Sequence, residues 1–473
     1  MSKKLDVEKL AEWTGGRWLS SQPGSIGGIC HDTRSLDAGD VYVALKGERF
    51  DGHDFVEDAF EKGAAASIVN DNWRGFFDWS NGNSIPNRPL LQVPDTTRAL
   101  MDMGRGYRDE LDIKVVGITG SAGKTTTKEL TADMLSSRYH VGRTIGNWNN
   151  KIGVPLSMLG LPENTEVGVL EVGTNHPGEL RPLCAAIRPE VGLITTIAPV
   201  HVEHFASLEA IAEEKAELIR ALPPEGVAIM PEPVASFDAV RAALNCRLLT
   251  VGIGEGSGYR CVSLDREKWL AKIHEVATGE DAEIEVPVPG EHNLMNLMIA
   301  VAAARHYMAP WESVRAAIRA YRPPRMRWEA RIIASRKVIN DAYNANPLSM
   351  RAAIDTFLSQ NHKKRWLILG GMAELGKAEA SEHLRLGQYI GLKCWDGVIL
   401  IGEPGEKIAE GIRITRGATK SVYVAENNRQ AAEIAAENVA KRAEILLKGS
   451  RFVKMETIVE DLLEIWERRR VIR

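Results

Sequence analysis

The chain has 473 residues, of which 44% are hydrophobic and 26% are charged, a composition typical of a globular protein with buried cores. Its 59 basic and 63 acidic residues give a net charge of −4, which offers no reason to expect nucleic acid as a partner. The five cysteines are odd in number and widely spaced, which argues against a disulfide framework or a zinc site. The sequence has neither an apolar signal core nor a membrane-spanning run, so we expect a cytoplasmic protein without membrane insertion.

The length predicts about three domains, and the first is expected to cover residues 1–104. Within it, residues 40–45 and 64–69 have the apolar character of strands, and residues 55–63 are predicted to form a helix. A passage rich in Gly, Asn and Pro at 81–89 is predicted to be a surface loop. The fold class predicted for this domain is α/β.

Residues 117–126 read GITGSAGKTT and stand between an apolar run and a helix-forming segment at 127–135. Glycines at such a strand–helix turn let backbone N–H groups converge on an anion, and the helix N-terminus favours negative charge. Lys124 would bring a positive charge to the outer phosphates and Thr125 a hydroxyl to Mg²⁺. Ile118 occupies the place of the first glycine of the usual P-loop. A purely structural turn is the alternative, but the strand context, the lysine and the threonine together favour ATP binding.

The predicted central domain, 105–324, alternates apolar strands with helices, which indicates a parallel sheet with helices on both faces. Its strands include residues 115–117, 167–170 and 191–194. Two prolines in the segment 322–325 end a predicted helix at 311–321 and indicate a linker. Beyond this linker the alternation restarts, which predicts a Rossmann-like α/β domain over 325–473 with strands at 337–340, 366–369, 398–401 and 445–447.

Two residues at predicted strand ends are candidate metal ligands. Glu171 follows the strand at 167–170, and the carboxyl end of a strand parallel to the P-loop strand faces the phosphate crevice. A carboxylate there is well placed to hold Mg²⁺. His201 ends the next strand run; it could equally be a structural histidine, and His204 is a neighbouring alternative.

Lys215 interrupts the apolar stripe of a predicted helix at 208–222. A lysine at such a position commonly snorkels to the surface or forms an ion pair. The competing interpretation is a lysine with a shifted pKa that can be modified covalently.

With these motifs in view, the chain resembles the Mur ligases, ATP-dependent enzymes that form amide bonds in peptidoglycan synthesis. The likeness covers nearly the whole chain, and the TGxxGKTT form of the P-loop is the one typical of this family. The Asp-Asn-Pro-Arg signature of the diaminopimelate-adding member is absent, which favours the dipeptide-adding member. The matching segments are residues 32–34, 39–41, 45–53, 63–64, 119–126, 146–155, 171–179, 290–296, 341–350 and 448–451.

The resemblance implies that D-Ala-D-Ala is joined to the carboxylate of UDP-N-acetylmuramoyl-tripeptide through an acyl phosphate, with release of ADP. It implies two Mg²⁺ ions, held by Thr125, Glu171, His201 and a carbamylated Lys215. The implied catalytic residues are Lys124, Glu171, His201, Lys215 and Arg327.

The same resemblance implies the binding sites of the substrates, which are small molecules, and we expect a monomer. The ATP site would comprise Thr119, Gly120, Ser121, Ala122, Gly123, Lys124, Thr125, Thr126, Asn293, Asn296, Arg327 and Asp341. The sites of the other two substrates would comprise Thr33, Arg34, Asp51, Gly52, His53, Asn147, Asn149, Asn150, Thr174, His176, Asn344, Asn346 and Ser349.

Three residues depart from the family pattern, each of them in a loop. Met326 stands where glycine is usual, Gly371 where aspartate is expected, and His204 where a small or aromatic residue is commoner. Three other functions stay open: a sister ligase such as folylpolyglutamate synthase, a P-loop ATPase that couples hydrolysis to movement or assembly, and a catalytically weak binding homologue.

Overall fold

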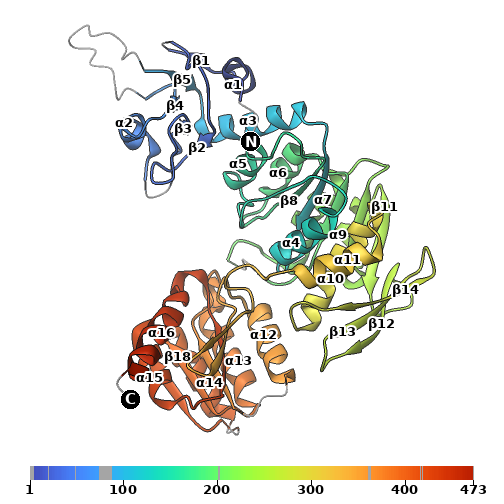
Figure 1. Cartoon of the computed structure of the whole chain (residues 1–473), viewed down its shortest axis with the longest axis vertical. Coiled ribbons are helices and arrows are strands. Elements are labelled where there is room, and N and C mark those ends of the chain that lie inside the picture. The colour runs from blue at the N-terminus through green and yellow to red at the C-terminus, as the bar shows by residue number, and fades with distance from the viewer. Residues whose placement is uncertain are drawn as a thin grey trace.

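The computed structural model describes residues 5–19, 21–47, 50–73, 88–200, 203–360, 364–415, 417 and 419–471, with side chains as far as residue 467. Three sheets define three domains, which follow one another in an arc from the N-terminus (blue) to the C-terminus (red) (Figure 1). The predicted three-domain α/β architecture is therefore confirmed. The loop predicted at 81–89 lies outside the described residues, except for its last two. In the part of the chain that the structure describes, no helix is long and apolar enough to cross a membrane.

The N-terminal domain is built on a sheet of strand order β1-β5-β4-β3-β2, in which only β1 is antiparallel to its neighbour. The strands predicted at 40–45 and 64–69 are β3 and β4, and all of their residues except Asn70 are buried because both faces of the sheet are covered. The elements are α1 (Val7–Thr14), β1 (Arg17–Trp18), β2 (Ile29–Cys30), β3 (Val41–Val43), η1 (Gly52–Phe55), α2 (Val56–Glu61), β4 (Ala66–Asn70), β5 (Leu90–Val93) and α3 (Thr96–Glu110).

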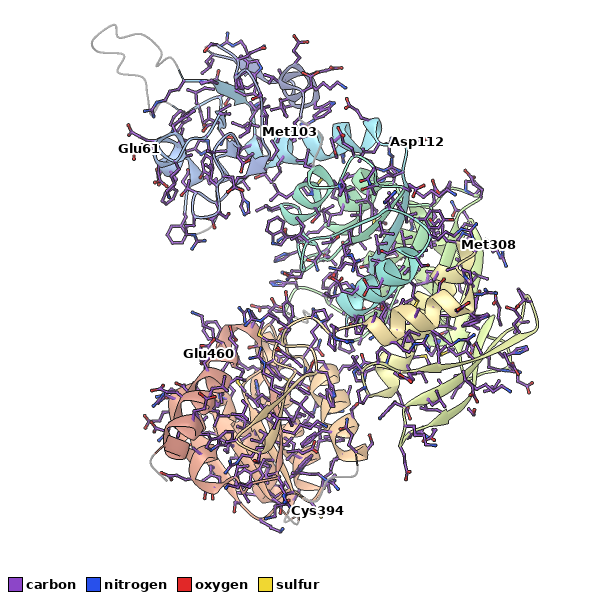
Figure 2. All side chains as sticks on the ribbon, in the orientation of Figure 1. Glu61, Met103, Asp112, Met308, Cys394 and Glu460 are labelled. Atoms are coloured by element: carbon purple, nitrogen blue, oxygen red, sulfur yellow. The ribbon has the colours of Figure 1, made fainter. Side chains whose placement is uncertain are left out.

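Helix α3 connects the N-terminal and central domains. It packs against α1 of the first domain and against α5 of the second, and its fully buried Met103 lies between the two domains (Figure 2). Near its C-terminal end, buried Arg108 donates to the carbonyls of Ile187, Leu111 and Ile113, at 3.2, 2.9 and 3.0 Å. The boundary predicted between residues 104 and 105 falls inside this helix, so the helix belongs to both domains.

The central domain contains a nine-stranded sheet of order β14-β13-β12-β11-β10-β9-β6-β8-β7. The strands from β7 to β12 pair in parallel, as predicted, but β12, β13 and β14 form an antiparallel meander that the sequence analysis missed. The elements are β6 (Lys114–Thr119), α4 (Lys124–Leu135), β7 (Val141–Arg143), α5 (Gly153–Leu159), β8 (Val167–Glu171), α6 (Leu180–Ile187), β9 (Val191–Ile194), α7 (Leu208–Arg220), β10 (Val227–Pro231), α8 (Glu232–Ala235), α9 (Asp238–Ala243), β11 (Arg247–Gly252), β12 (Tyr259–Asp265), β13 (Leu270–Glu275), β14 (Glu280–Glu285), α10 (Glu291–His306) and α11 (Trp311–Ala320).

The C-terminal domain has a sheet of order β15-β16-β20-β17-β18-β19, parallel except for β15. One cluster of buried apolar side chains continues from the central domain into this one, which joins their cores. The elements are β15 (Glu329–Ile333), β16 (Arg336–Asn340), α12 (Pro347–Ser359), β17 (Arg365–Leu369), η2 (Gly376–Ala378), α13 (Glu379–Gly391), β18 (Gly397–Ile401), α14 (Gly402–Thr415), β19 (Val422–Ala425), α15 (Asn428–Asn438), β20 (Glu444–Lys448), η3 (Arg451–Val453) and α16 (Glu456–Val471).

Candidate active site

The predicted P-loop connects β6 to α4, in the middle of the central sheet. Ile118 is a buried residue of β6, so the position where the usual motif has its first glycine belongs to the strand here. Gly120 and Gly123 have φ values of +148° and +85°. A Cβ atom at Gly120 would collide with the hydroxyl of Thr195, and one at Gly123 with the amide oxygen of Asn296. The loop therefore needs glycine at both positions, for backbone conformation and for space.

The P-loop is fastened to the segment that follows β9. The Ser121 N–H donates to the carbonyl of Thr196 at 2.8 Å, and the Ser121 hydroxyl donates to that of Ala198 at 3.0 Å. The hydroxyl of Thr195 donates to the carbonyl of Ala122 at 2.5 Å. These contacts hold the loop in shape without a ligand, which lowers the conformational cost of binding an anion. Thr195 thus helps to hold the P-loop in place, a role that the sequence did not predict.

Four predicted residues meet at the start of α4. Thr125 donates its hydroxyl proton to Glu171 Oε2 at 2.9 Å, and Arg327 Nη2 lies 3.0 Å from the Thr125 Oγ1 atom. Lys124 Nζ donates to the carbonyl of Gly120 at 2.7 Å. Burial lowers the pKa of Lys124; the Arg327 charge acts in the same direction, and Glu171 opposes it. Two cations and one carboxylate thus face the same small volume beside the P-loop.

Glu171, at the end of β8, is fixed by hydrogen bonds of its backbone and of both carboxylate oxygens. It is 1% exposed, and its N–H donates to the Thr144 hydroxyl at 2.8 Å. Its Oε1 atom accepts from Asn149 Nδ2 at 2.6 Å, while Oε2 accepts from Thr125. A buried carboxylate beside a hydroxyl offers the hard oxygen atoms that Mg²⁺ prefers, so these two residues fit the predicted metal.

Lys215 lies on the buried face of α7 and is only 3% exposed, which excludes the snorkelling interpretation. Burial, together with the charge of Lys124, lowers the Lys215 pKa to about 7, although Glu214 acts against this. The Glu214 carboxylate is committed elsewhere, because it accepts from the N–H groups of Gly178 and Leu180, each at 2.7 Å. Among the described residues, no hydrogen bond or ion pair of Lys215 is found.

His201 and His204 are the two histidines considered as metal ligands. His201 lies outside the described residues, so its assignment as a metal ligand stays a prediction. The His204 ring lies 4.1 Å from the ring of His176, measured between centroids. Within the described residues, no three His, Cys, Asp or Glu side chains gather as a metal site.

The first turns of α10 bring two predicted nucleotide-binding residues to the P-loop. Asn293 and Asn296 are 8% and 6% exposed, and Asn296 Nδ2 donates to Asn293 Oδ1 at 3.3 Å. The space that a side chain at Gly123 would need is occupied by Asn296. The P-loop and this pair are therefore neighbours, although about 170 residues separate them in the sequence.

Asp341 follows β16 and is reached from two directions. Its Oδ1 atom accepts from the Trp328 N–H at 3.2 Å, and its Oδ2 atom accepts from Lys448 Nζ at 2.7 Å. Lys448 is 3% exposed, and its role was not predicted. The guanidinium of Arg327 lies over the ring of Tyr343, 4.2 Å from the centroid. The contact of Trp328 with Asp341 and that of Arg327 with Tyr343 tie the segment that carries Arg327 to the rest of the C-terminal domain.

The residues predicted in the N-terminal domain lie in two turns around Tyr42. Burial raises the Tyr42 pKa to about 12, and Asp32 and Asp51 contribute to this from the two turns. Arg34, whose side chain is 87% exposed, pairs with Asp32 at 2.5 Å. In the other turn, His53 Nδ1 lies 2.6 Å from Asp51, and Gly52 accepts from the Tyr42 hydroxyl at 2.9 Å. The fifth predicted residue, Thr33, is buried next to Arg34.

The remaining predicted substrate-binding residues take part in hydrogen bonds within the protein. The Asn150 side chain accepts from the N–H of Gly153, the first residue of α5, at 2.8 Å, and the Asn149 carbonyl accepts from the Gly173 N–H at 2.7 Å. The loop after β8 is closed by a bond of 2.6 Å from the Thr174 hydroxyl to the carbonyl of His176. Asn346 and Ser349 form a capping box at the start of α12. The Asn147 carbonyl accepts from the Asn149 N–H, and the Asn344 carbonyl accepts from Lys448 Nζ at 3.2 Å.

Two of the departures from the family pattern have a visible structural setting. Met326 has φ +60°, a left-handed conformation that favours glycine, and its N–H donates to Glu329 Oε2 at 3.0 Å. A Cβ atom at Gly371 would lie 2.9 Å from the Pro404 ring. An aspartate in place of Gly371 would therefore require the Pro404 segment to move.

The loop after Gly371 is held by a buried histidine, and this predicts a pH dependence of stability. His383 is 1% exposed; its Nε2 atom accepts from Met372 N–H, and its Nδ1 atom lies on the Glu379 carbonyl, both at 2.8 Å. The ring is neutral in this arrangement, because a protonated imidazole could not accept. Burial lowers the His383 pKa. The hydrogen bond to the Glu379 carbonyl and the negative charges of Glu379 and Glu382 act in the opposite direction, but burial has the larger effect.

A group whose pKa is lowered by folding contributes stability above its unfolded pKa and loses it as the pH falls. We therefore expect the thermal unfolding midpoint to be lower at pH 5.5 than at pH 7.5. In His383→Gln the decrease should be smaller, because the glutamine oxygen can accept from Met372 and does not titrate. The half-buried His274, which pairs with Asp281 at 2.8 Å, provides the control variant His274→Gln. Equal pH dependence in the wild type and His383→Gln would contradict this.

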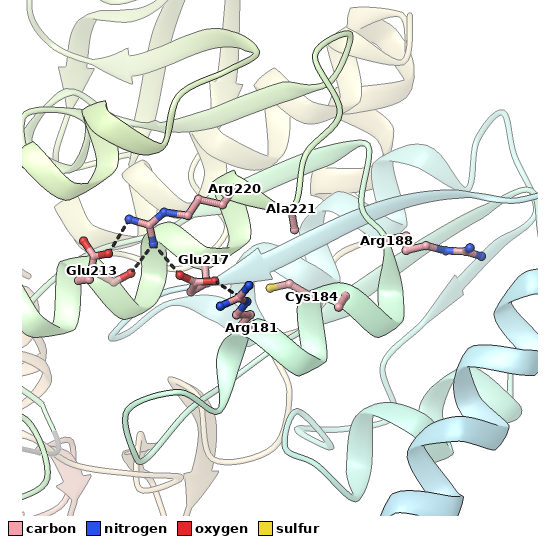
Figure 3. A pocket seen from close by; sticks show the side chains of 8 residues that line it. Arg181, Cys184, Arg188, Glu213, Glu217, Arg220 and Ala221 are labelled. Carbon is pink, nitrogen blue, oxygen red and sulfur yellow. Dashed lines mark hydrogen bonds and ion pairs between the residues drawn. The ribbon is translucent and has the colours of Figure 1, made fainter. Parts of the chain in front are cut away.

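A hollow of about 590 Å³ on the central domain is lined by residues of α6 and α7 (Figure 3). Arg220 pairs with Glu213 and Glu217 there, at 2.5 and 2.6 Å, and Arg181 reaches Glu217 at 4.0 Å. Because its charges satisfy one another and it does not include the P-loop, its size does not mark the active site. Its lining is Arg181, Cys184, Ala185, Arg188, Glu213, Glu217, Arg220 and Ala221.

A preformed P-loop on a parallel sheet, reached by an arginine from the start of a further α/β domain, defines a three-domain nucleotide-dependent enzyme of the P-loop class. Three family models match consecutive parts of the chain. They are "Mur ligase family, catalytic domain" over 25–102, "Mur ligase middle domain" over 118–304 and "Mur ligase, glutamate ligase domain" over 325–451.

Relatives match along nearly the entire chain. The UDP-N-acetylmuramoyl-tripeptide–D-alanyl-D-alanine ligase of Bacillus subtilis is 36% identical over 98% of this chain and 99% of its own. A crystal structure of MurF from Acinetobacter baumannii has a TM-score of 0.84 at 30% identity and covers 98% of this chain and 99% of that one. MurF from Thermotoga maritima, in complex with ADP, has a TM-score of 0.78 at 25% identity, with 93% and 98% covered. The chain belongs to the Mur ligase family.

Proposed function

We propose that this chain joins D-Ala-D-Ala to the terminal carboxylate of UDP-N-acetylmuramoyl-tripeptide, with cleavage of ATP to ADP and phosphate, in peptidoglycan precursor synthesis. The observation that carries this is the convergence of Lys124, Thr125, Glu171 and Arg327 beside a preformed P-loop. Similarity to dipeptide-adding ligases over the whole chain, N-terminal domain included, supports the choice of substrates over those of a sister ligase.

The chemistry has two steps. A carboxylate oxygen of the tripeptide attacks the γ-phosphorus, and the bond to the bridging oxygen of ADP breaks, giving an acyl phosphate. The dipeptide amine then attacks the acyl carbon, phosphate leaves from the tetrahedral intermediate, and the amine loses a proton.

The difficulty in the first step is bringing two anionic groups together. Two like charges 4 Å apart repel by about 4 kcal/mol at an effective dielectric constant of 20. Lys124 and Arg327 oppose this repulsion with positive charge at the outer phosphate. Arg327 lies at the start of the C-terminal domain and rests on Tyr343 of the same domain, so movement of that domain would change how the arginine meets the nucleotide.

Two Mg²⁺ ions belong to the proposal. Thr125 and Glu171 would hold the first, and His201 with Lys215 the second. Bound Mg²⁺ would supply further positive charge to the phosphates and the acceptor carboxylate. The lysine can serve only after carbamylation, because an ammonium group is no ligand for a cation.

Carbamylation of Lys215 requires the neutral amine, which makes up only about one molecule in two thousand at pH 7 when the pKa is about 10.4. With a pKa of about 7, roughly half of the Lys215 side chains are neutral at that pH. The carbamate would place an anionic oxygen near the positive charge of Lys124. Among the described residues, the unmodified Lys215 amine has no ion pair.

The substrate sites follow from the position of each group of residues. The P-loop from Thr119 to Thr126 would bind the phosphates, with Asn293 and Asn296 near adenine and Asp341 near ribose. The N-terminal turns would bind the nucleotide-sugar part of the acceptor: Thr33, Arg34, Asp51, Gly52 and His53. Residues after β7 and β8 would face its peptide: Asn147, Asn149, Asn150, Thr174 and His176. The dipeptide would lie near Asn344, Asn346 and Ser349. We further propose a cytoplasmic monomer that acts on small molecules and binds no nucleic acid.

The decisive experiment follows the mass of UDP-N-acetylmuramoyl-tripeptide with ATP, Mg²⁺ and D-Ala-D-Ala present. We expect it to increase by one dipeptide less one water, with one ADP formed per product. Omission of D-Ala-D-Ala should prevent the increase. ATP cleavage that is indifferent to the dipeptide would contradict the proposal and favour an ATPase that drives movement.

The N-terminal assignment predicts a selective effect of Arg34→Ala. Because the Arg34 side chain is exposed and touches only its own turn, its removal should leave the fold intact. The KM for UDP-N-acetylmuramoyl-tripeptide should rise about tenfold, which corresponds to roughly 1.4 kcal/mol of binding, while the KM for D-Ala-D-Ala stays nearly unchanged. The exposed Arg17 of the same domain supplies the control variant Arg17→Ala. Equal losses for both substrates would indicate general destabilisation instead.

A further inference from the structure

Lys128 is a completely buried cation on α4, one helical turn after Lys124, and no step of the reaction uses it. Its side chain is 0% exposed. The Nζ atom donates to the carbonyls of Thr144 and Gly146 at 2.9 and 2.7 Å, and it lies 2.7 Å from Glu129 Oε1. An ammonium group has three N–H donors, so all three are used.

The two carbonyls belong to the turn that leaves β7 and leads to Asn149. In this turn, the Thr144 hydroxyl accepts from the Glu171 N–H at 2.8 Å, which connects the turn to the end of β8. Gly146 has φ +52°, and the space around its Cα atom is open, so its neighbours do not fix it sterically. Lys128 thus supplies the side-chain contact that ties Gly146 to α4.

Three residues after Gly146, the chain reaches Glu171 a second time. Asn149 Nδ2 donates to Glu171 Oε1 at 2.6 Å, and the Asn149 carbonyl accepts from Gly173 N–H at 2.7 Å. A Cβ atom at Gly173 would lie 2.9 Å from the Asn149 side chain, so the two segments are in tight contact. The direction of the Glu171 carboxylate therefore depends on where the turn places Asn149.

We propose that Lys128 is a positioning residue, which fixes the turn at 144–149 and through Asn149 orients the Glu171 carboxylate toward Thr125. The inference rests on the proposed function only for its activity measurement. An apolar side chain would be the less costly occupant of a buried helix position, because a buried charge loses its hydration. An apolar side chain, however, could not donate to the carbonyls of Thr144 and Gly146, which lie beyond the end of β7 and receive no hydrogen bond from the described residues of the neighbouring strand.

A matched control exists in the same domain. Arg108 is also a buried cation, and it also donates to three backbone carbonyls, but these lie beside the amino end of β6. Lys128→Met and Arg108→Met each remove one buried cation and leave carbonyls without a donor. Both should therefore destabilise the fold, whereas only Lys128→Met should disturb the active site.

The first measurement is amide hydrogen exchange of the protein without nucleotide or metal. Lys128→Met should accelerate exchange in 144–153 and 171–173, and Arg108→Met should do so around 111–115. Thr144→Val, which removes the hydroxyl that accepts from Glu171, tests the same connection should Lys128→Met not fold. Unchanged exchange at 144–149 and 171–173 in a folded Lys128→Met would overturn the proposal, whatever reaction the enzyme catalyses.

The second measurement is turnover. We expect kcat to fall about 10²-fold in Lys128→Met, as displacement of a catalytic group by about 1 Å can cause, and to stay near the wild-type value in Arg108→Met. If Lys128 acts through Asn149, the double variant Lys128→Met with Asn149→Ala should be no slower than the slower single variant. Additive losses, or equal losses in Lys128→Met and Arg108→Met, would mean that Lys128 has only a structural role.

Discussion

Lys124→Ala should abolish ATP turnover while the fold stays intact. The Lys124 amine donates to a single protein group, the carbonyl of Gly120, so its loss removes one hydrogen bond from the protein. In the reaction, the same amine is expected to offset the charge that develops as the γ-phosphate is transferred. Removing one such preorganised contact typically costs 10²–10³ in kcat, or about 2.7–4 kcal/mol.

Phosphate release with both substrates present measures this loss, and the thermal unfolding midpoint verifies the fold. Lys114→Ala is the matched control, because Lys114 is an exposed lysine at the start of β6, the strand that leads into the P-loop. Normal turnover in Lys124→Ala would mean that the P-loop does not bind the nucleotide as assigned.

The parts of this fold that could be predicted from the sequence are those in which local pattern and tertiary environment agree. The strands at 167–171 and 191–194 are continuous apolar runs because helices cover both faces of a parallel sheet. The meander β12–β14 was missed because its residues alternate between buried and exposed, so β14, for example, contains three glutamates and one aspartate. Such a segment lacks the apolar run by which the other strands were identified.

The candidate site could be predicted as a set of residues but not as a network. The bond from Thr125 to Glu171 spans 46 positions and that from Arg327 to Thr125 spans 202, distances over which a sequence pattern carries no information. Lys128 went unnoticed for a related reason. Nothing in a helix-forming segment distinguishes a lysine buried under a neighbouring turn from one in solvent.

Lys215→Ala should reduce turnover about 10²–10³-fold, roughly 2.7–4 kcal/mol of transition-state stabilisation, because it would remove an anionic ligand of the second metal ion. Stability should respond in a different way. At pH 7 an unmodified lysine with a pKa of about 7 is about half neutral in the folded protein and charged in the unfolded one, so folding releases roughly half a proton. Its stabilising contribution is therefore greatest above an unfolded pKa of about 10.4 and is lost as the pH falls through 7.

At neutral pH, Lys215→Met, which keeps most of the side-chain volume, should consequently not lower the unfolding midpoint, although it should be as inactive as Lys215→Ala. This combination separates loss of function from loss of fold. A short carboxylic acid such as acetate should partly restore turnover in Lys215→Ala, where it can bring an oxygen ligand into the space that the lysine leaves, and not in Lys215→Met, where methionine fills it. Turnover near the wild-type value in Lys215→Ala would overturn the carbamate proposal, and a severe loss that acetate relieves only in the alanine variant would support it.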